Sequence, residues 1–135
     1  MFNSVQSMII TDCKSLEHNF FKLISESSPQ LKDLYIINKE PMKSKEESTS
    51  LIVFSHLILL GVETSHADYA EQFLVDKKCH LPCLMNLKIG YETLALVTNN
   101  FTNDATRLTC KKLTSLRIKE PFVPPKHFCE YFPLL

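Results

Sequence analysis

The stretch LMNLKI, residues 84–89, has leucine or isoleucine at its first, fourth and sixth positions. This L-x-x-L-x-[LIV] spacing occurs five times, and successive motifs begin 26, 26, 27 and 29 residues apart. One such motif is weak evidence because leucine is common, but five in near-constant register indicate an internal repeat. The apolar triplets are Val5/Met8/Ile10, Leu31/Leu34/Ile36, Leu57/Leu60/Val62, Leu84/Leu87/Ile89 and Leu113/Leu116/Ile118.

A repeat of this length lies within the range of leucine-rich repeats, in which a short strand is followed by a helix or a looser return. Stacked coils form a parallel sheet on the concave side and place helices or irregular loops on the convex side. We therefore predict an α/β fold, a short leucine-rich-repeat solenoid that forms one domain over residues 1–135. Its five irregular repeats have strands expected near residues 5–10, 31–37, 57–63, 84–89 and 113–119.

Four of the segments that follow the strands have amphipathic patterns that favour helices. The second return, PMKSKEESTS at residues 41–50, is polar and favours a solvated loop. Pro124 and Pro125 suit the start of the last helix. The apolar sides of the expected helices are Leu16/Phe20/Leu23/Ile24, Tyr69/Phe73/Leu74, Leu94/Val97/Phe101 and Phe128/Phe132.

Composition limits the classes of partner. Fifteen lysine and arginine residues balance fifteen aspartate and glutamate residues, so no overall field attracts nucleic acid or an anionic membrane. The first residues, MFNSVQSMII, lack the features of a signal peptide, and no apolar run is long enough to span a bilayer. We expect a cytoplasmic or nuclear protein in which most of the five cysteines are reduced thiols.

Cys79, His80 and Cys83 form the densest group of metal-ligating residue types. Structural zinc takes four ligands, so a site here would need Cys110, or His127 and Cys129, from another coil. The repeat offers a simpler interpretation, because Pro82 marks the return to the strand and Cys83 then lies between it and Leu84. We expect no metal and no cofactor, and interpret Cys13 and Cys129 as core thiols.

Motifs for an enzyme are missing. The chain contains no G-x-S-x-G, no Walker loop and no G-x-G-x-x-G, and only two glycines from which a phosphate cradle could be built. The five histidines are scattered and none occurs in an H-E-x-x-H spacing. We expect a protein that is not an enzyme.

Two segments, LMNLKIGYETLALVTNNFTND at 84–104 and LTSLRIKEPFVPPKHFCEYFPLL at 113–135, resemble the C-terminal part of F-box proteins of the leucine-rich-repeat type. In that family an F-box helix bundle docks the adaptor of a cullin-RING ubiquitin ligase, and the repeats hold the substrate. The resemblance implies a substrate-recognition role, with catalysis elsewhere in the complex. Because the first expected strand begins at Val5, we expect no F-box within the chain itself.

Strand side chains alternate, so residues between the consensus leucines should point to the concave side. They combine apolar groups with charge, a composition that suits an unknown protein or peptide ligand and makes the chain a non-catalytic recognition module. The alternatives are a truncated or decayed paralogue fragment without activity, and a zinc-stabilised or enzymatic α/β domain. The candidate partner-binding residues are Ile9, Asp33, Tyr35, Ile37, Leu59, Glu63, Lys88, Arg117 and Lys119.

Both ends of the chain carry unfinished repeat features. The ending YFPLL repeats the Pro-x-Leu that precedes Leu31 and Leu84, while the first strand is expected within a few residues of Met1. Coils of a solenoid bury apolar surface against their neighbours, and terminal coils normally need a polar cap. We therefore expect either a segment of a longer solenoid or self-association through uncapped ends.

Overall fold

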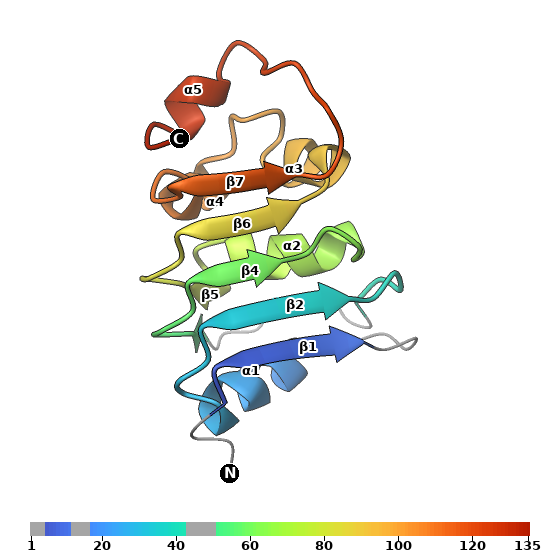
Figure 1. Cartoon of the computed structure of the whole chain (residues 1–135), viewed down its shortest axis with the longest axis vertical. Helices are drawn as coiled ribbons and strands as arrows, with labels where there is room; N and C mark the ends of the chain where they lie inside the picture. The colour runs from blue at the N-terminus through green and yellow to red at the C-terminus, as the bar shows by residue number, and fades with distance from the viewer. Residues whose placement is uncertain (1–4, 12–16, 43–50) are drawn as a thin grey trace.

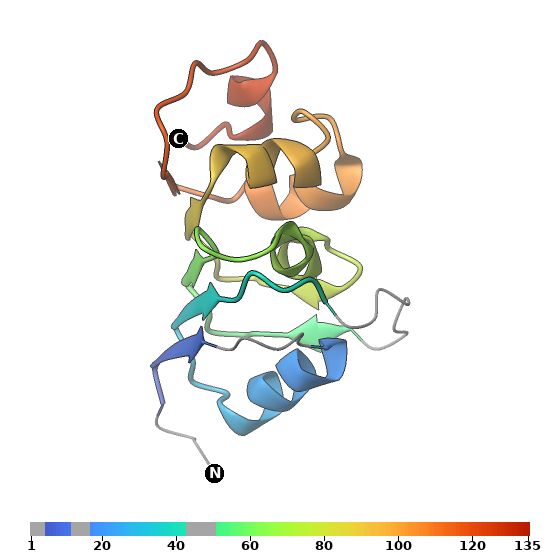
Figure 2. The same cartoon turned by 90° about the vertical axis from the view of Figure 1, so that its right-hand side faces the viewer.

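The computed structural model describes residues 5–11, 17–42 and 51–135. It has a mixed α/β architecture in which five parallel strands form one sheet, with helices on one side of it (Figures 1 and 2). The order in the sheet follows the order in the chain, so each segment between two of these strands returns the chain to the adjacent position. The strands are β1 (Ser7–Thr11), β2 (Asp33–Ile37), β4 (Leu59–Gly61), β6 (Asn86–Ile89) and β7 (Ser115–Ile118).

Each strand of this sheet overlaps one of the strand ranges expected from the repeat. The central residues of the five motifs, Met8, Leu34, Leu60, Leu87 and Leu116, pair with one another across the sheet. A shift of one residue in any strand would turn its leucines to the opposite face, so the apolar pattern determines this register. The period in the sequence is therefore the period of the sheet.

The motif residues form the core on the helix side of the sheet. Leu31, Leu57, Leu84 and Leu113, the first residues of four motifs, are all fully buried. Burying one such side chain contributes roughly 1.5–3 kcal/mol. Leu116 and Ile118 are only half-buried because β7 has a neighbouring strand on one side alone.

The same turn precedes four of the five strands of the large sheet. In each case the backbone N–H of the first motif leucine donates to the carbonyl oxygen three residues earlier. This turn directs the chain out of the return segment and into the sheet. The donors are Leu31, Leu57, Leu84 and Leu113, at 3.1, 3.5, 3.3 and 3.2 Å.

A second hydrogen-bond pattern recurs before successive strands of the large sheet. The carbonyl oxygen of Gln6 accepts the N–H groups of Lys32 and Asp33, at 2.8 and 3.0 Å. Because the acceptor and the donors lie at the starts of neighbouring strands, this pattern sets the offset of one strand against the next. The carbonyls of Lys32, Ile58 and Met85 each accept two N–H groups at the start of the next strand of this sheet in the same way.

The helices pack on one side of the sheet and bury most of the expected apolar residues. Tyr69, Phe73 and Leu74 of α2 are fully buried, as the sequence predicts. Leu94 and Val97 of α3 are also buried, in agreement with the predicted apolar side. The helices are α1 (His18–Ser27), α2 (Ala67–Leu74), α3 (Tyr91–Val97), α4 (Asp104–Cys110) and α5 (Phe128–Tyr131).

The predicted apolar side of α1 is partly wrong. Phe20 and Leu23 are 36% and 60% exposed, and the buried residues are Phe21 and Ile24. The helix is rotated so that the Phe21 ring meets the Phe73 ring edge-on, with 5.1 Å between the ring centroids. Contact with an aromatic side chain from α2 thus decides which side of α1 is buried.

Three further features differ from the sequence-based expectation. A two-stranded parallel sheet joins β3 (Ile52–Val53) to β5 (Cys79–His80). The fourth return contains the additional helix α4, whose N-terminus is capped by the Asn103 side chain. Helix α5 begins at Phe128, three residues after Pro125, and has only four residues.

Of the predicted polar loop, residues 43–50 lie outside the described part of the chain, as do Cys13 and Leu16.

An aromatic cluster packs around Phe101 at the C-terminal end. Asn99, Asn100 and Phe101 have φ values of 49°, 55° and 65°, a left-handed turn that asparagine tolerates better than phenylalanine. The turn places the Phe101 ring in the core, where the rings of three residues of the last segment meet it edge-on. Burial of the ring offsets the cost of this backbone conformation. We call Tyr91, Phe101, Phe122, Phe128, Tyr131 and Phe132 the C-terminal aromatic cluster.

Candidate binding face

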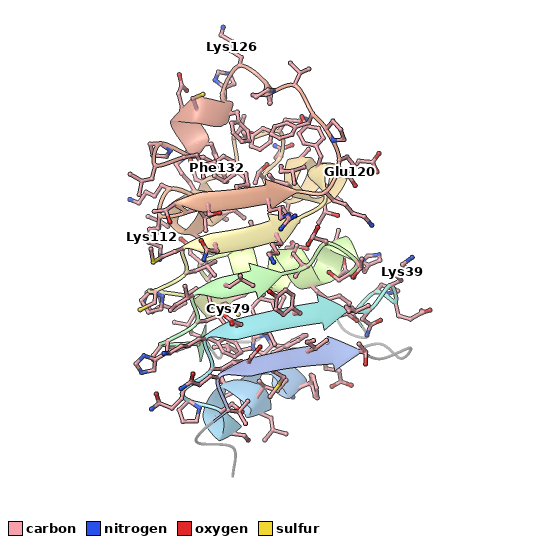
Figure 3. All side chains as sticks on the ribbon, viewed as in Figure 1. Lys39, Cys79, Lys112, Glu120, Lys126 and Phe132 are labelled. Atoms are coloured by element: carbon pink, nitrogen blue, oxygen red, sulfur yellow. The ribbon has the colours of Figure 1, made fainter. Side chains whose placement is uncertain are left out.

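The face of the large sheet opposite the helices is uncovered in the described residues. We call it the open face, and in Figure 3 it points towards the viewer with the helices behind. Of the strand residues that point to it, only Gly61 is buried, and the others are exposed or half-buried. The open face comprises Ser7, Ile9, Thr11, Asp33, Tyr35, Ile37, Leu59, Gly61, Asn86, Lys88, Ser115 and Arg117, together with Glu63 and Lys119 just beyond the strands.

All nine candidate residues from the sequence lie on this face. One row crosses the five strands in register, from Ile9 through Tyr35, Gly61 and Lys88 to Arg117. The chemistry of this row changes from aliphatic to aromatic to basic. The open face therefore has an apolar end at β1 and β2 and a basic end at β6 and β7.

Tyr35 and Lys88 meet at the centre of the row, across Gly61. The Lys88 Nζ donates a hydrogen bond to the Tyr35 Oη at 3.4 Å and lies 5.3 Å from the centre of the tyrosine ring. The ring covers Gly61 so closely that a Cβ there would be 2.4 Å from the Tyr35 Cδ1. Gly61 is thus part of the site although it was not among the nine candidates. Strand alternation already places Gly61 on this face, between Leu60 and Val62, and a glycine inside an apolar strand often marks a close approach.

A shallow hollow of about 220 Å³ lies where the C-terminal ends of β2 and β4 meet. Ile37 contributes apolar surface to it, while Glu63 and Lys119 contribute opposite charges. Lys119 follows β7 and Glu63 follows β4, so the hollow brings together residues separated by 56 positions in the sequence, the difference of their numbers. Its other lining residues are Tyr35, Ile36, Gly61 and Thr64.

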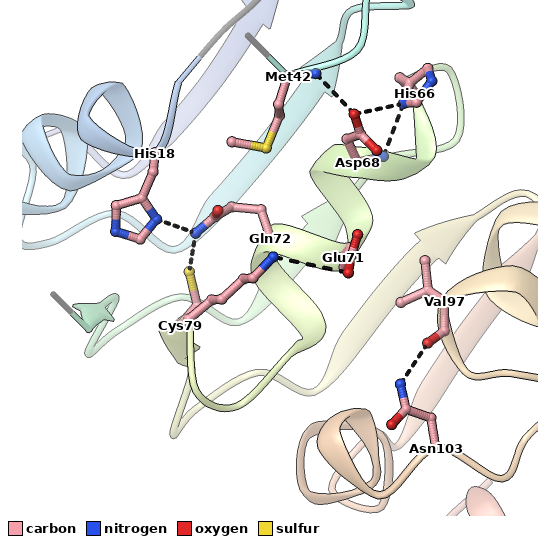
Figure 4. Close-up of polar contacts among 10 residues, drawn as sticks. His18, Met42, His66, Asp68, Glu71, Gln72, Cys79, Val97 and Asn103 are labelled. Atoms are coloured by element: carbon pink, nitrogen blue, oxygen red, sulfur yellow. Dashed lines mark hydrogen bonds and ion pairs between the residues drawn. The ribbon is translucent and has the colours of Figure 1, made fainter. Parts of the chain in front are cut away.

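Cys79, His80 and Cys83 do not converge. Cys79 is buried, whereas His80 and Cys83 are exposed. The Gln72 side-chain amide lies 3.6 Å from the Cys79 Sγ and 2.9 Å from the His18 Nδ1 (Figure 4). The cysteine belongs to a buried contact that joins α1, α2 and β5. Within residues 5–11, 17–42 and 51–135, no three His, Cys, Asp or Glu side chains are grouped as a metal site.

The buried thiols are poor nucleophiles. Burial raises the pKa of Cys79 to about 12, with hydrogen bonding from Gln72 and the charge of Lys78 acting in the opposite direction. Burial likewise raises the pKa of Cys110 to about 12, and a hydrogen bond with Tyr131 opposes the shift. A thiol with such a pKa stays protonated near neutral pH. The expectation that Cys129 is a core thiol is wrong, because its side chain is exposed on the outer side of the short helix α5.

Comparisons with protein-family models, with curated proteins and with solved structures found no significant match to the chain. None of the helices in the described part of the chain is long and apolar enough to cross a membrane. Function therefore has to be argued from the open face itself.

Proposed function

We propose that this chain is a leucine-rich-repeat solenoid that serves as a non-catalytic protein-recognition module, with the open face as its binding surface. The observation that carries the proposal is the exposure of Ile9 and Ile37, 63% and 44%, on an uncovered parallel sheet. Parallel sheets are normally covered on both faces, because their strands are apolar on both sides. An uncovered face with aliphatic and aromatic residues beside charges suits a protein or peptide ligand.

The solenoid part of the proposal is supported by the repetition of local geometry. The five strands follow chain order, and the turn before Leu31, Leu57, Leu84 and Leu113 has the same hydrogen bond each time. Each coil thus contacts mainly the coils before and after it, which is how repeat proteins grow. The segments that connect the strands differ in length and helix content, with one helix after β1 and two after β6. Such variation fits irregular leucine-rich repeats.

The resemblance of residues 84–104 and 113–135 to F-box proteins supports a more specific role. We propose that the module holds substrates for a ubiquitin ligase in the cytoplasm or nucleus, with the transfer chemistry performed by other subunits. In such proteins the F-box docks the ligase adaptor, so the repeats alone should not retain it. A pull-down with purified adaptor tests this, and stoichiometric binding to the isolated chain would contradict the assignment of its residues to the repeats.

Selection of ligands from a random peptide library displayed on phage tests the recognition function. The wild-type chain should enrich peptides, and Ile9→Asp/Ile37→Asp should lose most of their binding because it places two charges on the apolar end. Leu96→Asp is the matched control, since Leu96 is 70% exposed on α3, away from the open face. Peptides that bind all three proteins equally would show that the open face is not the binding surface.

A further inference from the structure

Three positive charges gather at the basic end of the open face. Lys88 lies directly opposite Arg117 in the ladder between β6 and β7, and Lys119 follows β7. Like charges directly opposite each other in a sheet destabilise it. The chain as a whole has no excess of basic residues, so composition does not account for the cluster.

No carboxylate neutralises this cluster in the described residues. Neither Lys88, Arg117 nor Lys119 forms an ion pair there. Glu63 lines the same hollow as Lys119 without pairing with it. Glu120 lies just after β7 (Figure 3). Its carboxylate accepts a hydrogen bond from the backbone N–H of Tyr91, the first residue of α3, at 3.0 Å. The three cations thus lie together without a carboxylate partner in the described residues, and Lys88 contacts only the hydroxyl and ring of Tyr35.

We propose that the ligand is an acidic protein segment whose carboxylates bind Lys88, Arg117 and Lys119 while its aliphatic side chains lie on Ile9, Tyr35 and Ile37. This inference rests on the proposed recognition function and adds the chemistry of the partner. A ligand carboxylate bound beside Arg117 and Lys88 removes the repulsion between these cations. Relief of this repulsion makes the free energy of binding more favourable. The guanidinium group of Arg117 can hold a carboxylate through two parallel hydrogen bonds.

The dimensions of the sheet set the spacing in the ligand. Adjacent strands lie about 4.8 Å apart, so β2 and β7, separated by three strand spacings, are about 14 Å apart. An extended peptide rises about 3.3 Å per residue, which makes this distance about four residues. The segment should have aliphatic residues at one end and Asp or Glu about four residues away, where the cations lie.

The acids on the open face decide against nucleic acid as the ligand. Asp33 lies on β2 within the apolar end and Glu63 follows β4 in the middle of the sheet, so a phosphate backbone crossing the sheet would meet both. Nucleic acid binding depends on a continuous track of positive charge. A short acidic peptide can place its neutral residues over these carboxylates and its acids over the cations.

The same peptide selection tests the chemistry. Peptides that bind wild type should carry the predicted aliphatic and acidic ends, and their affinity should fall about tenfold or more in Arg117→Glu/Lys119→Glu. Lys111→Glu/Lys126→Glu, which makes the same charge change at two exposed residues outside the open face, should stay within about twofold. When Arg117→Glu/Lys119→Glu is itself the target of the selection, it should enrich basic peptides. Far-ultraviolet circular dichroism verifies that both variants are folded.

Each contrary result has a distinct meaning. One result would overturn this inference and leave the recognition function standing. In that case the selected peptides would lack acids, lose binding to Ile9→Asp/Ile37→Asp and bind Arg117→Glu/Lys119→Glu as tightly as wild type. Failure to select any peptide that depends on the open face would overturn the recognition function and the inference with it. Tighter binding of a 12-nucleotide single-stranded oligonucleotide than of the selected peptides would overturn the inference in favour of nucleic acid.

Discussion

The ring of Tyr35 lies across Gly61 on the neighbouring strand, and a Cβ at Gly61 would be 2.4 Å from the Tyr35 Cδ1. No real Cβ contact is that short, so a larger residue at Gly61 must move the ring. The Lys88 Nζ also contacts this tyrosine, at 5.3 Å from the ring centre and 3.4 Å from the hydroxyl oxygen. The centre of the open face therefore depends on a residue that has no side chain.

We expect Gly61→Ala to destabilise the chain by about 1–3 kcal/mol, because it overpacks the space under the Tyr35 ring. Urea denaturation measures this change. In a Tyr35→Ala background the same substitution should cost much less, since the obstructing ring is gone. Additive costs in the double-mutant cycle would show that Gly61 and Tyr35 are not coupled.

Leu87→Ala should cost about 2–5 kcal/mol, since Leu87 is fully buried at the centre of the most regular motif. Met85→Ala, two residues earlier at a 46% exposed position, serves as the control and should stay near 0.5 kcal/mol. Arg117→Glu/Lys119→Glu should also leave stability within about 0.5 kcal/mol for each change. A near-neutral result for Leu87→Ala would contradict the assignment of this motif to the core.

Tyr131→Phe should cost about 1–3 kcal/mol, because it removes two hydrogen bonds of a buried hydroxyl, each worth about 0.5–1.5 kcal/mol. The Tyr131 hydroxyl is hydrogen-bonded to the Thr106 Oγ1 and donates to the Asn103 carbonyl oxygen at 2.7 Å. Tyr91→Phe is the matched control within the C-terminal aromatic cluster, because no residue in the described part of the chain hydrogen-bonds with its hydroxyl. Thermal unfolding of the two variants should separate them, and equal melting temperatures would contradict the role of the hydroxyl.

Stability should fall as the pH rises above about 9. Burial raises the pKa of both Cys79 and Cys110 from 9.0 to about 12, so these thiols ionise in the unfolded chain before they do so in the folded one. Between pH 9 and 12 the folded state binds more protons, and each thiol lowers the unfolding free energy by up to about 1.4 kcal/mol per pH unit. Denaturation in reductant at pH 7.5, 9 and 10.5 measures the slope. Cys79→Ala should reduce it, whereas Cys83→Ala, at an exposed position, should leave it unchanged.

We expect concentration-dependent association through the edge of β7 that pairs with no other strand in the described residues. A cleft of about 620 Å³ beside this edge is lined by apolar residues, among them Leu116, Ile118 and Phe122, and by the charged Lys119 and Glu120. Unpaired strand edges with apolar surface pair readily with other chains. Sedimentation velocity over a wide concentration range measures it, and Leu116→Lys should weaken association while Val123→Lys, at an 87% exposed residue outside the cleft lining, should not. A strictly monomeric wild-type chain would refute this expectation.

The sequence by itself determined the parallel strands, their order and the apolar residues that face the helices. Side chains of a strand alternate between its two faces with a period of two residues. The motifs that begin at Leu31, Leu57, Leu84 and Leu113 recur at nearly constant intervals. Both patterns can be read directly from the sequence. The same alternation placed the nine candidate binding residues on the opposite face. These inferences needed no knowledge of which side chains touch across the fold.

Only the tertiary structure decided the rest, because it depends on contacts between residues distant in the sequence. The side of α1 that is buried follows from Phe21 meeting Phe73 of α2, which no periodicity within α1 specifies. The pairing of β3 with β5 joins two strands of two residues each, too short for a pattern. Strand alternation places Gly61 on the open face, but its contact with the Tyr35 ring arises only from the pairing of β2 with β4. The cation pair of Lys88 and Arg117 likewise arises from the register of β6 with β7, where side-chain neighbours are set by packing between coils.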